Sequence, residues 1–586
     1  MLLSWLTGLG AGLLSLHFLQ KLLFPYFWDD FWYLLKVVRY GIQMEMYKLR
    51  GELVTVLDKF LSHTRKQPRK AFIIYEGDVY TYEDVDKRSN RIAHALLNHS
   101  SLKRGDVVAL LMSNEPDFVH VWFGLAKLGC VVAFLNSNLR FDSLLHCINT
   151  CEPTAVVVGG DLLGSIEEIL PSLPKHVRVW GMKDSVPEGI DSLQEKLSLA
   201  SDEPVPPSHH VTSSLKSTCL YIFTSGTTGH HYQLCATLLN AFYQSLHIGA
   251  TCVLKKKFSA SQFWNDCKKY NVTVFQYIGE LCRYLCKQPQ REGEKDHRVR
   301  LAVGNGLSSD VWRQFLDRFG NIKMCELYGA TEGNIVFMNH TGKIGSVGRA
   351  NFFYSLFFSF ELIKYDFQKD EPWRNGQGWC SCVRKGEPGL LISRVNKKNP
   401  FFGYAGSDTH TKSKLLFDVF RKGDVYFNTG DLMFQDQENF VYFWDRLGDT
   451  FRWKGENVAT TEVADVLGRL DFIQEANVYG VRVPGYEGKA GMTSVILKPN
   501  KSLDLEKMYN QVVTSLPAYA CPLFLRIQDK METTGTFKLK KLQLVEEGFD
   551  PLKISDPLYF MDNLKKSYVP LTEEIYNQIM SEEVKL

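Results

Sequence analysis

Short apolar runs alternate with segments of helical periodicity over residues 51–150. Three of the apolar runs predict strands: residues 72–75, 105–112 and 130–134. A helix is predicted to start at Thr81, because this cap residue is followed three positions later by Asp84. A second, apolar helix is predicted over residues 118–128, ending at Gly129. This alternation predicts a mostly parallel sheet with covering helices.

Strand-like apolar runs and segments of helical periodicity continue beyond residue 220. An amphipathic helix is predicted from apolar residues spaced four apart: Leu234, Leu238, Phe242 and Leu246. Further strands are predicted over the apolar runs 251–254, 322–327 and 389–393. Residues 424–445 predict short β-strands, and residues 446–586 have an αβ pattern of their own. We therefore predict a large domain over residues 51–445 and a small carboxyl-terminal domain over residues 446–586.

The amino terminus, residues 1–50, is predicted to anchor the chain in a membrane. Residues 2–20 contain no charged residue and have the length of a helix that spans a bilayer. No basic region precedes this run and no small-residue cleavage site follows it, which argues against a removed signal peptide. The basic residues of this region come after it: Lys21, Lys36, Arg39, Lys48 and Arg50. The positive-inside rule then puts the bulk of the chain in the cytosol; a buried or interfacial helix is the alternative.

Composition narrows the class of protein. Of the 586 residues, 45% are hydrophobic and 23% are charged, as in globular proteins of several domains. The net charge of +3 is too small to favour nucleic acid as a partner. The thirteen cysteines are scattered without a C-x-x-C pair and predict reduced, mostly buried thiols. The histidine pairs at residues 209–210 and 230–231 lack spaced partners, so we interpret them as loop residues rather than metal ligands.

Residues 221–229 are the most informative candidate for chemistry, because an apolar strand leads there into a loop of serine, threonine and glycine. The loop residues are Thr224, Ser225, Gly226, Thr227, Thr228 and Gly229. Glycines let backbone N–H groups approach a phosphate, and the hydroxyls add hydrogen-bond donors. No lysine follows within twenty residues, although phosphate loops usually add one. An ordinary surface turn is the alternative interpretation.

Four further segments carry polar groups suited to a nucleotide. Residues 328–332 (Tyr-Gly-Ala-Thr-Glu) supply a ring, a hydroxyl and a carboxylate. Residues 428–432 (Asn-Thr-Gly-Asp-Leu) present an aspartate that can accept two hydrogen bonds from a ribose diol. Residues 445–457 are dense in charge and turns, and residues 533–538 place a lysine after a flexible turn. Each segment alone is a weak signal, whereas all five in this order are very specific.

In this order the segments resemble the adenylate-forming superfamily of acyl-CoA synthetases, luciferases and peptide-synthetase adenylation domains. The block of residues 417–463 is similar to the fatty acid transport proteins, also called very-long-chain acyl-CoA synthetases. Residues 1–5 and 23–30 narrow this resemblance to one branch of the family, and the resemblance covers nearly the whole chain except residues 230–248. It implies an α/β fold: a large amino-terminal domain of mixed sheets with flanking helices and a small β-barrel, then a small α+β lid domain.

The resemblance implies a ligase that activates a long- or very-long-chain fatty acid in two steps. Attack of the carboxylate on ATP gives an acyl-adenylate and diphosphate, and the thiol of coenzyme A then displaces AMP. ATP, Mg²⁺, coenzyme A and the fatty acid are the implied ligands, and fatty acid uptake is the implied role. We expect one membrane span, in the plasma membrane or the endoplasmic reticulum, with the catalytic part cytosolic. Homodimer formation is left open.

For the nucleotide, the resemblance assigns a role to each motif. Residues 224–229 hold the β- and γ-phosphates. The residues that flank the adenine are Gly304, Asn305, Gly306 and Tyr328. The ribose hydroxyls are bound by Asp431 and contacted by Arg446. A plain turn residue is the alternative interpretation of Asp431.

For catalysis, the resemblance points to Thr331, Glu332 and Lys538. Thr331 contacts the α-phosphate, and Glu332 binds Mg²⁺, which bridges phosphate oxygens. Lys538 reaches the α-phosphate and the carboxylate in the first step, and a rotation about the hinge Asp445 then removes it before the thiol enters. A helix-capping acid and a solvated surface lysine are the alternative interpretations of Glu332 and Lys538.

The chain departs from the family pattern directly after the phosphate loop. The family continues with Gly-Leu-Pro-Lys, whereas this chain reads Gly229-His230-His231-Tyr232. Residues 230–248 also replace a longer stretch, so a strand and a helix are missing together. Losing them would cost more than the roughly 5–15 kcal/mol by which a domain is stable. We therefore predict poor folding and little activity, as in a splice form that lacks part of the ATP site. A non-catalytic fatty-acid transport or binding protein is the alternative function.

Overall fold

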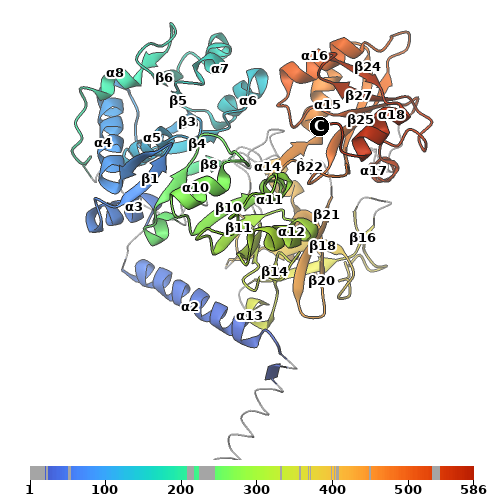
Figure 1. Ribbon diagram of the computed structural model, residues 1–586, viewed down its shortest axis with the longest axis horizontal. Helices are drawn as coiled ribbons and strands as arrows, with labels where there is room; N and C mark the ends of the chain where they lie inside the picture. Colours follow the sequence, from blue (N-terminus) through green and yellow to red (C-terminus); the bar gives the residue numbers. More distant parts are fainter. Residues whose placement is uncertain are drawn as a thin grey trace, which may run out of the picture.

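The computed structural model describes residues 20–21, 24–50, 54–206, 217–222, 245–329, 333–355, 358–366, 369, 371–397, 399–401, 403, 408–447, 450–530 and 541–586. Figure 1 shows the elements of the first two hundred residues, in blue and teal, on one side of the molecule. The carboxyl-terminal elements, in orange and red, gather on the other side, and the green elements lie between them.

A parallel sheet organises the first part of the chain. Six of the described strands form it in the order β7-β6-β5-β3-β4-β8. The strands are β3 (Val107–Leu111), β4 (Val131–Leu135), β5 (Ala155–Gly159), β6 (Arg178–Met182), β7 (Asp191–Ser192) and β8 (Leu220–Ile222). The accompanying helices are α4 (Tyr82–His99), α5 (Pro116–Lys127), α6 (Phe141–Cys151), α7 (Leu163–Glu167), the 3₁₀ turn η1 (Leu170–Ser172) and α8 (Leu193–Leu197). The predicted alternation of strand and helix is confirmed.

Each face of this sheet belongs to a different hydrophobic core. Along β3, Val108 and Leu110 pack into the core that includes α4 and α5, whereas Ala109 and Leu111 pack into the core that includes α6 and α7. Side chains alternate across a strand, so a strand buried on both faces is apolar throughout. β8 differs, because its three residues are only half-buried and it is the last strand in the described part of the sheet.

Two smaller sheets follow. β2 (Asp78–Thr81), β1 (Ala71–Tyr75) and β9 (Cys252–Leu254) pair in that order, which joins segments almost 180 residues apart. In the second sheet the parallel strands β10 (Val274–Ile278), β11 (Leu301–Asn305) and β12 (Lys323–Gly329) are followed by the antiparallel β13 (Val336–Met338). Its helices are α10 (Phe263–Lys269), α11 (Gly279–Lys287) and α12 (Ser309–Phe319).

An antiparallel sheet closes the large domain. Its described strands are β14 (Gly348–Arg349), β15 (Phe360–Ile363), β18 (Gly389–Arg394), β19 (Leu415–Phe417), β20 (Val425–Gln435) and β21 (Phe440–Arg446). They run in the order β14-β21-β20-β18-β15, with β19 on β20. Beside them lie α13 (Phe352–Ser355), α14 (Asp408–Ser413) and the pair β16 (Tyr365–Asp366) and β17 (Glu371–Pro372). The expected β-structure is confirmed here as a sheet, whereas its closure into a small barrel stays a prediction.

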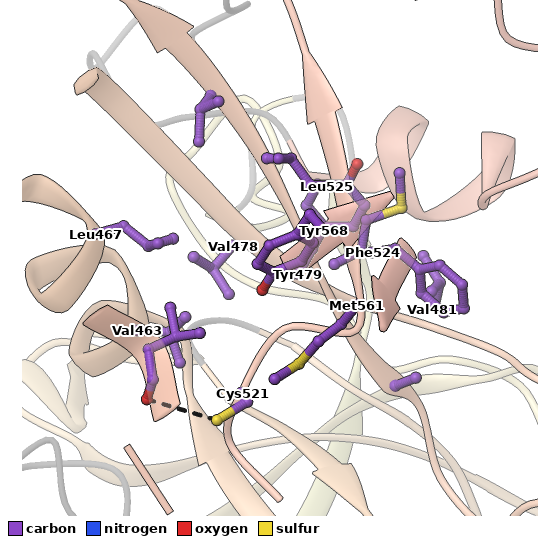
Figure 2. Packing of buried hydrophobic residues seen from close by; sticks show 14 of the residues in the cluster. Val463, Leu467, Val478, Tyr479, Val481, Cys521, Phe524, Leu525, Met561 and Tyr568 are labelled. Carbon is purple, nitrogen blue, oxygen red and sulfur yellow. Dashed lines mark hydrogen bonds between the residues drawn. The ribbon is translucent and has the colours of Figure 1, made fainter. Parts of the chain in front are cut away.

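The carboxyl-terminal part has its own sheet and core. The hairpin β22 (Thr450–Trp453) and β23 (Glu456–Ala459) leads into a five-stranded sheet of β24 (Ile473–Val481), β25 (Ala490–Leu497), β26 (Phe524–Ile527), β27 (Leu558–Asp562) and β28 (Ser567–Pro570). Its helices are α15 (Thr460–Gly468), α16 (Leu505–Ser515), α17 (Leu542–Glu547) and α18 (Glu573–Met580). Figure 2 shows Tyr479, Phe524 and Tyr568 packed together in this core. The domain boundary predicted at residue 446 stays a prediction.

Two helices precede the sheets, α2 (Phe27–Leu49) and α3 (Val56–Lys66). Within the described ranges, none of the helices combines the length and the apolar character that a membrane crossing requires. The predicted span, residues 2–20, lies almost entirely outside the described residues. Among the described cysteines, twelve are free thiols and eight of these are buried, as predicted.

The starts of α4 and α5 lie at or near the residues predicted from local sequence signals. Thr81 accepts a hydrogen bond from the Asp84 N–H while the Asp84 side chain accepts from the Thr81 N–H, so the predicted cap of α4 is confirmed. α5 begins at Pro116, two residues before the predicted start, because proline is favoured in a first helical turn. The helix predicted around Leu234 to Leu246 lies mostly outside the described residues, as do the histidine pairs.

Candidate functional site

The carboxyl ends of β10, β11 and β12 meet at one edge because these strands are parallel. β11 ends at Asn305, so Gly304, Asn305 and Gly306 form the bend that leaves this edge. β12 ends at Gly329, which puts Tyr328 at the same edge. Ligands of α/β proteins bind outside the carboxyl ends of parallel strands. The four residues predicted to flank the adenine therefore share one edge of one sheet.

The bend after β11 leaves no room for larger residues. A Cβ atom at Gly304 would lie 2.1 Å from the carbonyl oxygen of Tyr277, and one at Gly306 would lie 3.2 Å from Nη1 of Arg452. Gly306 also has a φ of +77°, a conformation that favours glycine. These glycines let the bend pack between the end of β10 and the guanidinium of Arg452.

Glu326 lies beneath this bend as a buried carboxylate. It accepts hydrogen bonds from Tyr277 Oη at 2.6 Å and from the Leu307 N–H at 3.1 Å. Burial raises the pKa of Glu326 to about 7, and the two hydrogen bonds and the nearby Arg452 moderate that rise. Glu326 therefore ties the segment after Gly306 to β12.

Asp431 is the centre of a second buried cluster. Tyr328 Oη donates to Asp431 Oδ2 at 2.6 Å, and Arg446 donates from Nε to Oδ1 at 2.6 Å and from Nη2 to Oδ2 at 3.3 Å. Asp431 and Arg446 face each other because they are paired in the register of β20 and β21. Burial and the charge of Asp431 raise the pKa of Tyr328 far above its usual value, so its hydroxyl remains a donor. Three predicted nucleotide residues are thus in direct contact.

A tight turn holds the Asp431 backbone in place. Gly430 has a φ of +72°, and its N–H donates to Asn428 Oδ1 at 3.0 Å. The Asp431 N–H donates to Thr429 Oγ1 at 3.1 Å, and the Thr429 hydroxyl donates to the Leu391 carbonyl at 2.7 Å. Every residue of the motif Asn428-Thr-Gly-Asp431 therefore contributes to the position of the carboxylate.

Arg452, Glu326 and Tyr277 are site residues that sequence reasoning missed. Arg452 stands on β22, and its charge acts on both Glu326 and Arg446, so it lies between the two clusters. The density of charge over residues 445–457 was a signal for Arg452, although it did not single this residue out. For Glu326 the signal was a lone carboxylate within an apolar strand.

Contacts between α11 and the carboxyl-terminal part lie beside the site. Arg283 Nη2 donates to Glu487 Oε2 at 2.9 Å, and Glu280 accepts from the Glu487 N–H at 3.1 Å. One turn further, Lys287 Nζ donates to Glu582 Oε2 at 2.8 Å and to the Gly485 carbonyl at 2.9 Å. The first pair is largely buried and the second is exposed. These contacts fix the orientation of the carboxyl-terminal domain relative to α11.

The remaining predicted residues lie outside the described part of the chain. They are Thr224, Ser225, Gly226, Thr227, Thr228, Gly229, Thr331, Glu332 and Lys538. For the hinge Asp445, only the backbone is described, and it pairs with Leu432 in β21. The described residues contain no group of three or more histidine, cysteine, aspartate or glutamate side chains that could hold a metal ion. The expected Mg²⁺ site at Glu332 therefore stays a prediction.

Comparison with known proteins identifies the relatives of this chain. A family described as AMP-binding enzyme matches residues 60–231 and 233–356, and one described as AMP-binding enzyme C-terminal domain matches residues 462–538. The chain is 92% identical to long-chain fatty acid transport protein 6 of Mus musculus and 72% identical to that of Homo sapiens, with 100% of each chain covered. These two relatives belong to the branch of the family that residues 1–5 and 23–30 predicted, so this prediction is confirmed.

Solved structures share the fold at low sequence identity. An o-succinylbenzoate CoA synthetase from Bacillus subtilis has a TM-score of 0.65 at 20% identity and covers 84% of this chain and 98% of its own. A long-chain-fatty-acid-CoA ligase from Archaeoglobus fulgidus has a TM-score of 0.60 at 16% identity and covers 81% of this chain and 97% of its own. The expected acyl-CoA ligase fold is confirmed.

The comparisons also bear on the shortened segment. The match to the AMP-binding enzyme family is interrupted at Tyr232, three residues after the phosphate loop. The alignment with the mouse relative runs over 619 positions, which is 33 more than the 586 residues of this chain. The relative therefore has residues for which this chain has no counterpart.

Proposed function

Since this chain belongs to the AMP-binding enzyme family, and within it to the long-chain fatty acid transport proteins, we propose that it is a membrane-anchored ligase that joins long- or very-long-chain fatty acids to coenzyme A. The reaction converts ATP, fatty acid and coenzyme A into acyl-CoA, AMP and diphosphate. A thioester cannot diffuse back across the membrane, so the reaction promotes uptake of the acid.

The observation that carries this proposal is the contact of Asp431 with Tyr328 and Arg446. Asp431 is a carboxylate fixed by two donors, and it lies next to the sheet edge that bears Gly304 to Gly306. An oriented carboxylate accepts hydrogen bonds from a ribose diol, and an aromatic ring beside it packs on an adenine. Arg446 is the most exposed member of the cluster, so we propose that it moves onto the ribose when ATP binds.

The other motif residues complete the proposed reaction. Residues 224–229 and Thr331 hold the phosphates, while Lys538 offsets the charge of the α-phosphate as the fatty acid carboxylate attacks it. Glu332 follows β12 in the sequence and offers a carboxylate of the type that Mg²⁺ prefers, so it would hold this ion, which would offset the charge of the phosphates. The carboxyl-terminal domain then turns about Asp445, which breaks its contacts with α11 and admits the thiol.

We place the protein in the plasma membrane or the endoplasmic reticulum. Residues 2–20 supply the proposed single span, and the basic residues that follow keep the catalytic part cytosolic. This arrangement brings the site close to the bilayer in which a long-chain fatty acid dissolves.

Fatty-acid-dependent release of diphosphate from ATP tests the proposal with the purified full chain. We expect release that needs both oleate and Mg²⁺, and acyl-CoA formation once coenzyme A is added. Asp431→Ala serves as the variant with an impaired site, and Asp436→Ala as a matched control in the turn between β20 and β21. Absence of fatty-acid-dependent diphosphate from a folded wild-type chain would contradict the ligase proposal.

The interruption at Tyr232 favours a second function, that of a non-catalytic fatty-acid transport or binding protein. A chain that lacks residues next to its phosphate loop would bind ATP weakly and still retain surfaces for a fatty acid. Binding of a fluorescent fatty acid without any diphosphate release would support this second function. The same result is expected of an inactive splice form.

A further inference from the structure

α2 has two faces of opposite kind, and its inner face docks on the protein. Asp30 forms a buried ion pair with Arg349, and the ring of Tyr33 stacks on His340 with centroids 4.3 Å apart. Further along, Tyr40 contacts His247, and Tyr47 accepts a hydrogen bond from Lys59 Nζ at 3.4 Å. These positions recur at helical spacing, so contacts of polar and aromatic side chains are distributed along one face of α2, on which the ring of Tyr40 stays 42% exposed.

The outer face of α2 is apolar although it faces solvent. The residues of this outer face are Trp28, Trp32, Leu35, Ile42, Met46 and Leu49, and their exposed fractions lie between 41% and 86%. They follow one another at intervals of three, four or seven, so they form one stripe along the helix. Next to the start of α2, Phe352 on α13 is also largely exposed. Helices on the surface of a soluble domain usually show the reverse pattern.

The charges around the outer face are mostly positive. Arg39 lies within the stripe, and Lys36 and Arg50 lie beside it and are exposed. Asp29 and Glu45 stand on its two flanks. Tryptophans with basic residues are typical of helices that lie in the headgroup region of a bilayer, where rings sit among the lipids and cations meet anionic headgroups.

The position of α2 in the chain agrees with this occupant. The uncharged segment of residues 2–20 precedes it directly in the sequence. Figure 1 shows α2 along the border of the molecule, with α13 beside its start. A helix that follows a membrane span within a few residues starts at the depth of the headgroups.

We propose that the outer face of α2 lies in the cytosolic headgroup layer of a bilayer and holds the large domain against it; this rests on the proposed membrane anchoring. The partner is a lipid surface that contains anionic headgroups. The inner face, through Asp30 and the tyrosines, sets the angle at which the large domain meets the bilayer. A second copy of the chain bound to the same face is the competing occupant.

Quenching of tryptophan fluorescence by brominated lipids tests the proposal on the full chain, reconstituted in vesicles of phosphatidylcholine and phosphatidylserine. Three variants separate the contributions: Trp5→Phe for the span, Trp28→Phe/Trp32→Phe for the outer face, and Trp379→Phe as a control for a tryptophan in the antiparallel part of the large domain. In the wild type, Trp5, Trp28 and Trp32 share the quenching by brominated lipid. We expect the outer-face variant, which removes two of these three, to lose about two thirds of it. The control is expected to lose none.

Each outcome decides a different question. Quenching that depends on Trp5 but not on Trp28 and Trp32 would leave the anchor in place and overturn the outer-face proposal. Quenching that depends neither on Trp5 nor on Trp28 and Trp32 would overturn the proposed membrane anchoring itself. A charge variant, Leu35→Glu/Ile42→Glu, is expected to abolish the quenching of Trp28 and Trp32, whereas Leu199→Glu/Leu564→Glu, at exposed leucines elsewhere, is expected to preserve it. A dimer in detergent that Leu35→Glu/Ile42→Glu converts to a monomer, with Trp28 and Trp32 unquenched in vesicles, would assign the face to a second copy.

Discussion

At the scale of residues, we expect the affinity for ATP to depend on the hydrogen bonds around Asp431. Tyr328→Phe removes a hydroxyl that donates to a buried carboxylate at 2.6 Å, and Asp431→Ala removes the acceptor of two residues. A hydrogen bond to a charged group contributes about 1.5–3 kcal/mol. We expect each variant to raise the Kd for ATP by about tenfold or more, as measured by calorimetry. If the Kd for ATP is unchanged in Asp431→Ala as well as in the control Asp436→Ala, Asp431 is not part of the nucleotide site.

Glu326 gives a prediction for pH. Burial raises its pKa to about 7, whereas the carboxyl in an unfolded chain titrates near 4.3, roughly its free value. Between these values the folded state binds more protons than the unfolded state, so the free energy of unfolding falls as pH rises through this window. We expect Glu326→Gln to flatten that fall by about 3 kcal/mol between pH 4.5 and 7. Urea unfolding of wild type and variant at several pH values checks this, and parallel curves would contradict it.

The same residues show which parts of the site are visible in a sequence. Tyr328 and Asp431 were predictable because each stands in a motif whose residue types suit a nucleotide, and Arg446 was predictable from the resemblance of its motif to the family. Glu326 and Tyr277 were not, since their roles depend on a strand register that brings residues 49 positions apart into contact. Only tertiary packing determines such a register.

At the scale of elements, the cap of α4 carries a measurable part of the stability. Thr81→Ala removes the side-chain acceptor of the Asp84 N–H and leaves the backbone N–H of residue 81 to donate to Asp84, and capping residues contribute about 1 kcal/mol. We expect a loss of this size in the free energy of unfolding, measured by urea denaturation. Thr514→Ala is the matched control, because the Thr514 hydroxyl donates to the Asn510 carbonyl within α16 and caps no helix end. Equal losses in the two variants would argue against a role of the cap.

Elements with local signals were predicted closely, and elements that depend on distant partners were not. The buried strands β3 and β4 and the helices α4 and α5 were predicted from their periodicity and from the cap of α4. The pairing of β1 with β9 has no local signal, because it joins the start of the domain to a strand that follows the shortened segment. β8 was predicted as the strand that bears the phosphate loop, yet its half-buried residues could not be foreseen from an apolar sequence.

At the scale of the whole molecule, we expect the interruption at Tyr232 to lower both stability and activity. β8 is the last strand in the described part of its sheet, and its three residues are only half-buried. Inserting the corresponding segment of the mouse relative after Tyr232 is expected to raise the thermal midpoint and to increase diphosphate release by about 10²–10³ or more. A glycine-serine stretch of equal length is the control. If both insertions behave alike, the prediction that the missing residues limit activity is wrong.

The ion pairs between α11 and the carboxyl-terminal domain are expected to make turnover depend on ionic strength. Of its two ion pairs, Lys287 with Glu582 is exposed and therefore screened by salt, whereas Arg283 with Glu487 is sheltered. If this domain rotates during each catalytic cycle, moderate salt weakens the Lys287–Glu582 pair and leaves the Arg283–Glu487 pair intact. Arg283→Ala removes the sheltered pair and leaves the exposed one, so we expect rotation in this variant to become sensitive to salt. The response of the two half-reactions to salt then shows which of them uses the arrangement in which both pairs are formed.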